Sequence, residues 1–278
     1  MKGMDTREKK KSAHLRRWLT AIIAVPFLIY IIGFGPRELF HLLLFLAAIT
    51  GQFEFYRITC PDLSKLVQGA GALLTLWLFL SLSLGQVFIL PAIILSWVLV
   101  PMTLVMFTYR SVGTQSMHFL ANAIMAPLYA CLPLSLLILV DKRHDGDLWV
   151  FFLLAVIFLG DTGAFYFGRL FGKHKLYPSV SPGKTWEGAI GGLFSSLIAA
   201  LVFFLFIPLY KWGVAIIGLT AALSIAGQIG DLAESVIKRT YGVKDSGGIL
   251  PGHGGILDRI DGLLFSIPIL YIYLSWSI

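Results

Sequence analysis

Long apolar segments separated by short polar ones follow one another along almost the whole chain of 278 residues. A helix needs roughly 20 mostly apolar residues to cross the hydrocarbon core of a bilayer. About nine segments reach that length, approximately 18–35, 38–59, 66–83, 87–107, 117–140, 148–168, 187–209, 212–237 and 262–278. The pattern therefore predicts an all-α protein, a polytopic integral membrane bundle of about nine transmembrane helices.

The composition excludes an ordinary soluble globular protein. Hydrophobic residues make up 57% of the chain and charged residues only 13%, whereas soluble domains have about 45–50% and about 25%. The basic tail 1–17 precedes the first apolar segment without a small-residue cleavage site. We therefore expect an uncleaved, cytosolic N-terminus.

The basic residues also predict the orientation. If all nine segments cross, only Arg37, Lys142, Arg143 and Lys211 of the 22 Lys and Arg residues lie opposite the cytosol. This bias follows the positive-inside rule and places loops 169–186 and 239–261 in the cytosol. The net charge of +7 then reflects topology and contact with anionic lipids, and we expect no nucleic-acid partner.

The two halves of the chain differ in where their polar residues lie. Segments 18–140 are apolar and predict a scaffold, whereas polar residues interrupt the segments of 148–278, the expected catalytic region. Glu54 is interpreted as an interfacial residue paired with Arg57. Cys60 and Cys131 show no metal-ligand spacing and are assigned no function.

Two aspartates lie inside apolar segments. Asp161 and Asp231 each precede an arginine by eight residues, which places them about 12 Å inward from that basic flank. An aspartate in a membrane is costly, so it indicates a functional site, although an ion pair with a lysine of another helix is the alternative. A glycine precedes each aspartate and would let another group approach the backbone closely.

The eighth segment carries a second polar group. Asp231, Ser235 and Lys238 share one helical face, and Glu234 is placed to pair with Lys238 at i, i+4. Carboxylates bind Mg²⁺ and lysine neutralises phosphate, so this face suits a phosphate ligand with a metal. A Glu–Lys pair near a helix end is also common elsewhere.

The glycine-rich segment after this helix predicts a loop around a phosphate-bearing ligand. Lys244 and Asp245 precede five glycines and His253, and glycines let backbone N–H groups approach an anion. His253 is either a site residue or an ordinary loop histidine. Asp258 and Asp261 then begin the last helix on one face, where they either cap it or join Asp231 in a magnesium site.

The loop before the seventh segment offers further phosphate contacts. Ser181, Lys184 and Thr185 could bind a nucleotide or a lipid phosphate. Alternatively, Trp186 is an interfacial anchor and Lys184 a topology signal.

The run SVIKRTYGVKDSGGILPGHGGILDRID, residues 235–261, resembles the signature of CDP-diacylglycerol synthases, also called phosphatidate cytidylyltransferases. GDTGAF at 160–165 and SPGKTWEG at 181–188 resemble two further segments of that family, so the similarity covers roughly residues 155–265. Gly183 departs from the pattern, which commonly has a second lysine there.

The resemblance implies that CTP and phosphatidate react to CDP-diacylglycerol and pyrophosphate, with Mg²⁺ required, in a homodimer. Whether a second, monovalent cation joins Mg²⁺ stays open. By the same resemblance, Asp231, Asp258 and Asp261 hold the metal and act in catalysis with Lys238. The expected substrate-binding residues are Ser181, Lys184, Thr185, Ser235, Arg239, Lys244, Asp245, His253, Arg259 and Asp161.

Two other classes of function remain open from the residues alone. A cation-coupled transporter also uses intramembrane aspartates, but it would carry polar residues in both halves of the chain. Another lipid-phosphate cytidylyltransferase or a polyprenol kinase would differ only in its acceptor pocket.

Overall fold

The computed structural model describes residues 25–207, 213–249 and 254–277, and most of them are helical. Seven helical spans in these ranges are long and apolar enough to cross a membrane. Two further helical stretches, residues 25–33 and α10, are not among these seven, so seven of the nine predicted spans are found in the described residues. The predicted fold class, a polytopic helical membrane protein, is confirmed. The helices are α2 (Arg37–Thr59), α3 (Lys65–Ser83), α4 (Leu90–Val112), α5 (Ser116–Ala126), α6 (Leu132–Asp141), α7 (Gly146–Phe171), α8 (Trp186–Phe206), α9 (Val214–Thr240) and α10 (Leu257–Ser277).

The segment expected at 117–140 is a helix with an internal irregularity. A π-helical turn, Pro127–Cys131, separates α5 from α6. Proline has no N–H to donate and its ring clashes with the preceding turn, so the helix widens at this point. Two short 3₁₀ turns, Val87–Ile89 and Gly113–Gln115, precede α4 and α5. Part of the first expected segment, 18–35, lies outside the described residues.

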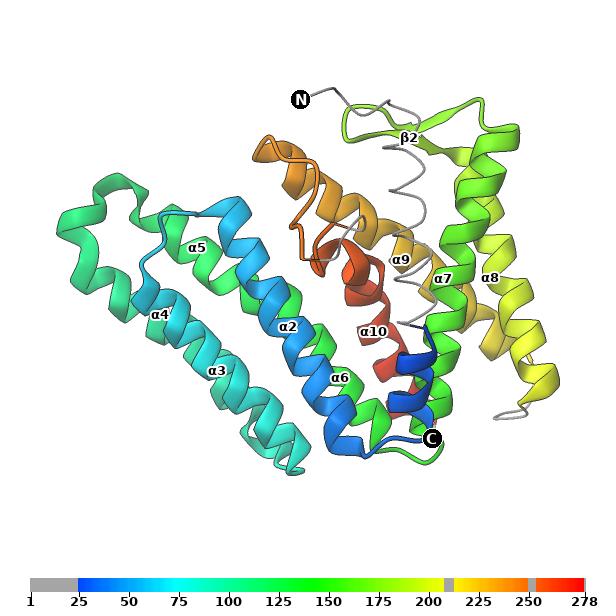
Figure 1. The fold of residues 1–278 in the computed structure, drawn as a ribbon, viewed down its shortest axis with the longest axis horizontal. Helices are drawn as coiled ribbons and strands as arrows, with labels where there is room; N and C mark the ends of the chain where they lie inside the picture. The colour runs from blue at the N-terminus through cyan, green and yellow to red at the C-terminus, as the bar shows by residue number, and fades with distance from the viewer. Residues whose placement is uncertain (1–24, 208–212, 250–253, 278) are drawn as a thin grey trace, which may run out of the picture.

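The helices form two groups that meet along α10. In Figure 1, α3 and α4 lie at one side of the molecule and α7 and α8 at the other, with α2, α6, α10 and α9 between them. The last helix packs against α9 and α6 and also contacts α2 and α7. It is therefore the element that joins the N-terminal and C-terminal halves.

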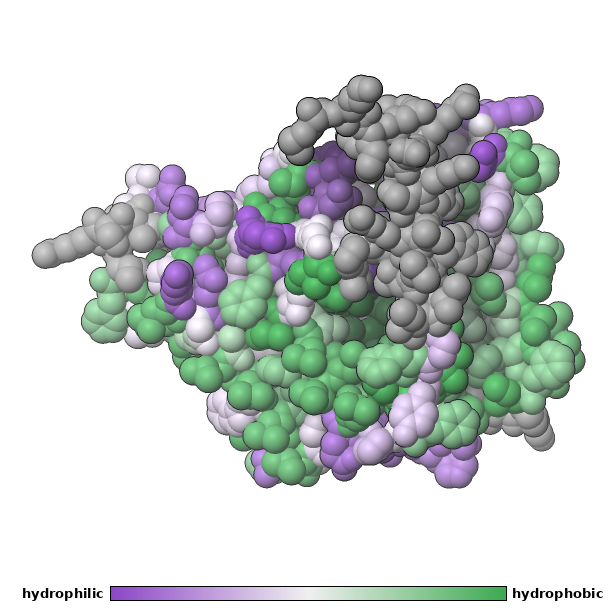
Figure 2. All heavy atoms as spheres, viewed as in Figure 1, coloured by the Kyte–Doolittle hydropathy of each residue, from purple (hydrophilic) through white to green (hydrophobic). Residues whose placement is uncertain are grey.

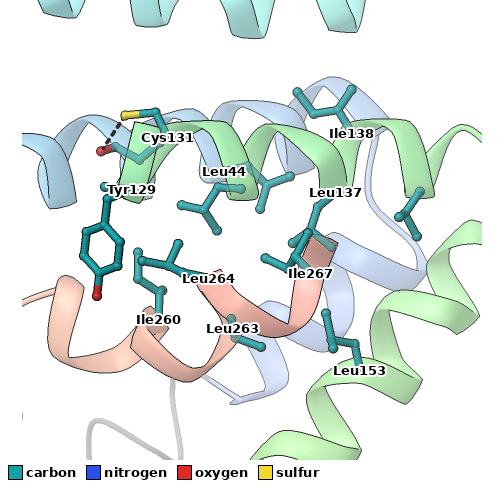
Figure 3. Packing of buried hydrophobic residues seen from close by; sticks show 14 of the residues in the cluster. Leu44, Tyr129, Cys131, Leu137, Ile138, Leu153, Ile260, Leu263, Leu264 and Ile267 are labelled. Carbon is teal, nitrogen blue, oxygen red and sulfur yellow. Dashed lines mark hydrogen bonds between the residues drawn. The ribbon is translucent and has the colours of Figure 1, made fainter. Parts of the chain in front are cut away.

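Leucine and isoleucine side chains fill the space between these helices (Figure 3). Leu44 of α2, Leu137 of α6 and Leu153 of α7 face Leu264 and Ile267 of α10 in one buried cluster. Each such buried side chain contributes roughly 1.5–3 kcal/mol in water, whereas packing between helices in lipid relies more on close contact. Dense contact along α10 thus holds its first turn in a defined place.

Small residues bring α7 and α8 close together. A side chain added at Gly160 would overlap the hydroxyl of Ser196, and one added at Gly163 would overlap Ser195. Glycine and serine at a helix interface let backbones approach in a membrane, where no hydrophobic effect drives the helices together. The glycine before Asp161 therefore serves helix packing.

Apolar side chains form a broad band across the face seen in Figure 2, with hydrophilic residues gathered towards its two ends. Large hydrophobic side chains lie fully outward, such as Phe34, Phe88 and Val214, each at least 80% exposed. Such a surface is incompatible with water and fits a lipid environment. The protein is a multi-pass integral membrane protein.

Three consecutive residues at the C-terminal end of α6 tie separate helices together. Asp141 is buried and binds Arg37 at 3.0 Å and His41 at 3.1 Å, both on α2. Lys142 donates to two carbonyl groups at the end of α3, and Arg143 donates to a carbonyl at the end of α10 at 2.6 Å. Basic side chains at helix C-termini satisfy carbonyls that have no partner within the helix. We call Asp141, Lys142 and Arg143 the α6-end cluster.

The loop expected at 169–186 contains a β-hairpin that the apolar pattern did not predict. Strand β1 (Lys175–Tyr177) pairs antiparallel with β2 (Ser181–Thr185). Thr185 ends β2 and caps α8, since its hydroxyl accepts a hydrogen bond from the Gly188 N–H at 3.1 Å. The hairpin is therefore fixed directly to the start of a membrane helix.

Candidate active site

A polar cavity of about 610 Å³ lies where α7, α8, α9 and the start of α10 meet the hairpin. Figure 1 shows the hairpin and the connection between α9 and α10 at the same end of the molecule. The cavity is lined by charged and polar side chains in an otherwise apolar protein. These are Asp161, Arg169, Ser181, Lys184, Thr185, Gln228, Asp231, Lys238, Asp245, Asp258, Arg259 and Asp261.

Helical periodicity places several of these residues on the sides of α7 and α9 that face the cavity. On α7, Asp161 and Arg169 are eight residues apart with Phe165 between them, and all three line the cavity. On α9, Asp231 and Lys238 are seven residues apart and face it as well. Spacings of three, four and seven residues return to the same side of a helix, so each helix presents one polar stripe.

The hairpin brings a cation to the aspartate of α9. The Lys184 ammonium of β2 lies 2.6 Å from a carboxylate oxygen of Asp231. The two side chains are 26% and 40% exposed, so the pair is open to solvent. Such pairs contribute only about 0–1 kcal/mol to stability, and a phosphate or a metal ion could displace either partner. The alternative interpretation of Asp231 was an ion pair with a lysine of another helix, but the lysine that Asp231 binds lies on the hairpin, and both side chains line the cavity.

A buried cluster of charges links α9 to α10. Lys238 donates to Glu234 of its own helix, as the i, i+4 spacing predicted, and to Asp258 of α10 at 2.6 Å. The side chains are 12%, 1% and 7% exposed, respectively. The two carboxylates hold the Lys238 ammonium in one orientation at the cavity wall.

Both carboxylate oxygens of Asp258 have partners within the protein: one oxygen binds Lys238, and the other binds the loop before α10. Its second oxygen accepts from the Ser246 N–H and hydroxyl, both at 2.9 Å, and from the Gly255 N–H at 2.8 Å. Asp261, one turn further, accepts from the Gly262 N–H at 2.8 Å and also lines the cavity. Of the two predicted ligands on α10, Asp261 is thus the more available.

The donor set fits a magnesium ion that arrives with a phosphate ligand. Among the described residues, no three Asp, Glu, His or Cys side chains are grouped closely enough to hold a metal alone. Magnesium, however, usually binds one or two carboxylates and completes its shell with water and substrate phosphates. Asp231 and Asp261 supply two such carboxylates on one cavity, and Asp161 supplies a third nearby.

Some predicted substrate-binding residues are placed away from the cavity. Ser235 and Lys244 are described but do not line it, whereas Asp245 and Arg259 do. Arg239 donates to the carbonyl of Val180, between the two strands, at 3.2 Å, so it fastens the hairpin to the end of α9. His253 lies outside the described residues.

Two of the polar residues that line the cavity were not predicted as site residues. Arg169 and Gln228 both face the cavity, and Gln228 also donates to the Ala189 carbonyl of α8 at 3.1 Å. Their spacing from Asp161 and Asp231 along one helical face is the signal that could have identified them.

The interpretation of Glu54 as a partner of Arg57 is wrong. Glu54 accepts hydrogen bonds from Ser246, Ile256 and Leu257, and the Arg57 guanidinium donates to the Ser246 carbonyl at 2.7 Å. The glycine before Asp231 likewise serves packing, because a side chain there would overlap the backbone carbonyl of Asp261. Contacts between distant segments explain both differences.

Comparison with known proteins agrees with the chemistry of this cavity. The model of the cytidylyltransferase family matches residues 15–277. A phosphatidate cytidylyltransferase of Staphylococcus saprophyticus is 37% identical over 269 residues, covering 93% of this chain and 98% of the relative. One of Staphylococcus haemolyticus is 38% identical over 267 residues, covering 93% and 98%. One of Staphylococcus aureus is 41% identical over 179 residues, covering 64% and 69%. The chain therefore belongs to the cytidylyltransferase family.

Proposed function

We propose that this protein is a phosphatidate cytidylyltransferase, which forms CDP-diacylglycerol and pyrophosphate from CTP and phosphatidate. The observation that carries the proposal is that Lys184, Lys238, Arg259, Asp231 and Asp261 all line the same cavity. Cations of this kind suit a triphosphate, and carboxylates suit its magnesium ion. Relatives of this name at 37–38% identity over nearly the whole chain support the assignment.

The reaction needs positioning and charge neutralisation. A phosphate oxygen of phosphatidate attacks the α-phosphorus of CTP and forms a new P–O–P bridge. The bond from the α-phosphorus to the oxygen bridging to the β-phosphorus breaks, and pyrophosphate leaves with that electron pair. Holding both phosphates in line removes entropy from the barrier, and fixed charges stabilise the transition state. No covalent link to the protein is required.

The charged residues divide this work. Lys184 and Arg259 would bind phosphate oxygens, while Lys238, fixed by Glu234 and Asp258, would present a charge that needs no reorganisation. Asp231 and Asp261 would hold Mg²⁺, which when bound neutralises charge on the triphosphate. Asp258 acts mainly by orienting Lys238 and the glycine-rich loop.

The end of the bundle that carries the hairpin would face the cytosol. The bias of basic residues supports this orientation. Access of the substrate supports it as well, since soluble CTP must reach the cavity from the cytosol. A site among the ends of membrane helices suits a reaction between a soluble nucleotide and a lipid headgroup. That the protein acts as a homodimer, and that a monovalent cation joins Mg²⁺, stay predictions.

Substitution of the two aspartates tests the proposal. In Asp231→Asn and Asp261→Asn, transfer of label from [α-³²P]CTP into lipid should fall at least about 100-fold, because the charge that holds the metal is lost. Asp62→Asn is the control, since Asp62 is exposed in the turn between α2 and α3. Full activity in a folded Asp261→Asn protein would contradict the assignment.

A further inference from the structure

Glu54 lies deep in the N-terminal half of the protein but binds the loop and helix of the candidate site. It belongs to α2 and is only 3% exposed. Its two oxygens accept from the Ile256 N–H at 3.1 Å, the Leu257 N–H at 2.8 Å and the Ser246 hydroxyl at 3.1 Å. These partners are about two hundred residues away in sequence, so the contact joins the two halves of the chain.

These contacts cap the last helix from outside. The first N–H groups of a helix have no partner within it, and the helix dipole favours negative charge there. Since α10 begins at Leu257, Glu54 supplies both an acceptor and a negative charge at this N-terminus. Burial of the carboxylate is offset by three hydrogen bonds.

Ser246 connects Glu54 to the charged cluster of the cavity. Its hydroxyl lies 3.1 Å from an oxygen of Glu54 and 2.9 Å from an oxygen of Asp258. Arg57, one turn after Glu54, donates to the Ser246 carbonyl at 2.7 Å. The Ser246 hydroxyl has one proton and donates to one of these two carboxylates at a time, whereas the Ser246 N–H donates to Asp258 at 2.9 Å. Hydrogen bonds therefore lead from α2 through Ser246 to Asp258, and from there to Lys238.

Two glycines of the loop leave the space that the Glu54 carboxylate occupies. A side chain at Gly247 would overlap the Glu54 carboxylate, and one at Gly255 would overlap both that carboxylate and the Ser246 hydroxyl. Glycine at these positions lets the backbone N–H groups approach the carboxylate directly. Part of the glycine content of this segment is thus explained by a protein contact and not by a ligand.

We propose that Glu54 is a positioning residue for cytidylyl transfer, which sets the place of the first turn of α10 and hence of Asp261 and Arg259. It does not line the cavity and acts only through these residues. The inference rests on the proposed function of the cavity, and it gives the N-terminal half a role beyond that of a scaffold.

Glu54→Gln tests this role, because an amide group of the same size would point an N–H₂ group at a backbone N–H. In substrate-free protein, hydrogen exchange at the amides of residues 256 and 257 should accelerate relative to wild type. The kcat should fall about 10–100-fold, as for residues that orient ligands at metal sites, with a smaller change in the KM for CTP. The matched control is Glu38→Gln, on the exposed first turn of the same helix.

Normal kcat in a folded Glu54→Gln protein whose amides exchange faster would overturn the proposal, since the helix start would then be loosened without effect. If that variant does not fold, Ser246→Ala removes the hydroxyl that lies between Glu54 and Asp258 and should lower kcat about fivefold. An unchanged kcat in Ser246→Ala would equally count against it. Asp261→Asn tests the site separately: if it stays active, the site assignment fails whatever Glu54 does.

Discussion

Individual charged residues at the end of the bundle opposite the cavity each secure a different helix. Arg37, Lys142 and Arg143 are three of the exceptions to the predicted bias of basic residues, and all three are engaged. A cation that satisfies a carboxylate or helix-end carbonyls is less available as a free charge. The exceptions therefore have a structural cause that charge counting alone does not reveal.

Asp141→Asn should weaken the α6-end cluster without affecting the reaction. It removes the charge that binds Arg37 and His41, and we expect the free energy of unfolding in detergent to fall by about 1–3 kcal/mol. Turnover per folded molecule should stay unchanged. Asp145→Asn, on the exposed turn beside it, is the control. Intact stability combined with lost turnover would show that this network serves the active site instead.

At the scale of single residues, the sequence identified side chains by charge and spacing but not by partner. Asp231, Asp261 and Lys184 were predicted and do line the cavity. Glu54 was misinterpreted because its partners are far away in sequence, and no local pattern encodes them. Residues on one helical face can be grouped from sequence, whereas contacts between distant segments require the fold.

At the scale of elements, apolar length predicted the helices well and the short hairpin not at all. Strands β1 and β2 have three and five residues with no alternation of apolar and polar positions. Such strands are defined by their pairing and by the ties of Arg239 and Thr185 to α9 and α8. The break in the fifth span, by contrast, follows directly from Pro127.

The crossing of α9 and α10 depends on Gly230. A methyl group there would overlap the Asp261 carbonyl, so Gly230→Ala should push α10 away, lower the free energy of unfolding by about 1–3 kcal/mol and reduce activity. Gly218→Ala, on the same helix, is the control because nothing lies within 4 Å of the added group. Thermal unfolding and turnover are measured for Gly230→Ala and Gly218→Ala. If the two variants have the same stability and the same activity, the crossing of α9 and α10 is not tight at Gly230.

At the scale of the whole molecule, the two halves are interdependent. α10 packs between them, and its first turn is held by Glu54 from one half and Lys238 from the other. The division into a scaffold, 18–140, and a catalytic region, 148–278, describes where the lining residues lie. It does not describe how they are held, and we expect neither half to assemble the cavity alone.

The most direct test is conversion of the two substrates by purified, detergent-solubilised protein. With labelled CTP, phosphatidate and Mg²⁺, the account predicts that label enters CDP-diacylglycerol with one pyrophosphate released per product, and that a chelator stops both. Wild-type protein that is folded but forms no labelled lipid from phosphatidate would contradict the account. A panel of other lipid phosphates under the same conditions would then identify a different acceptor.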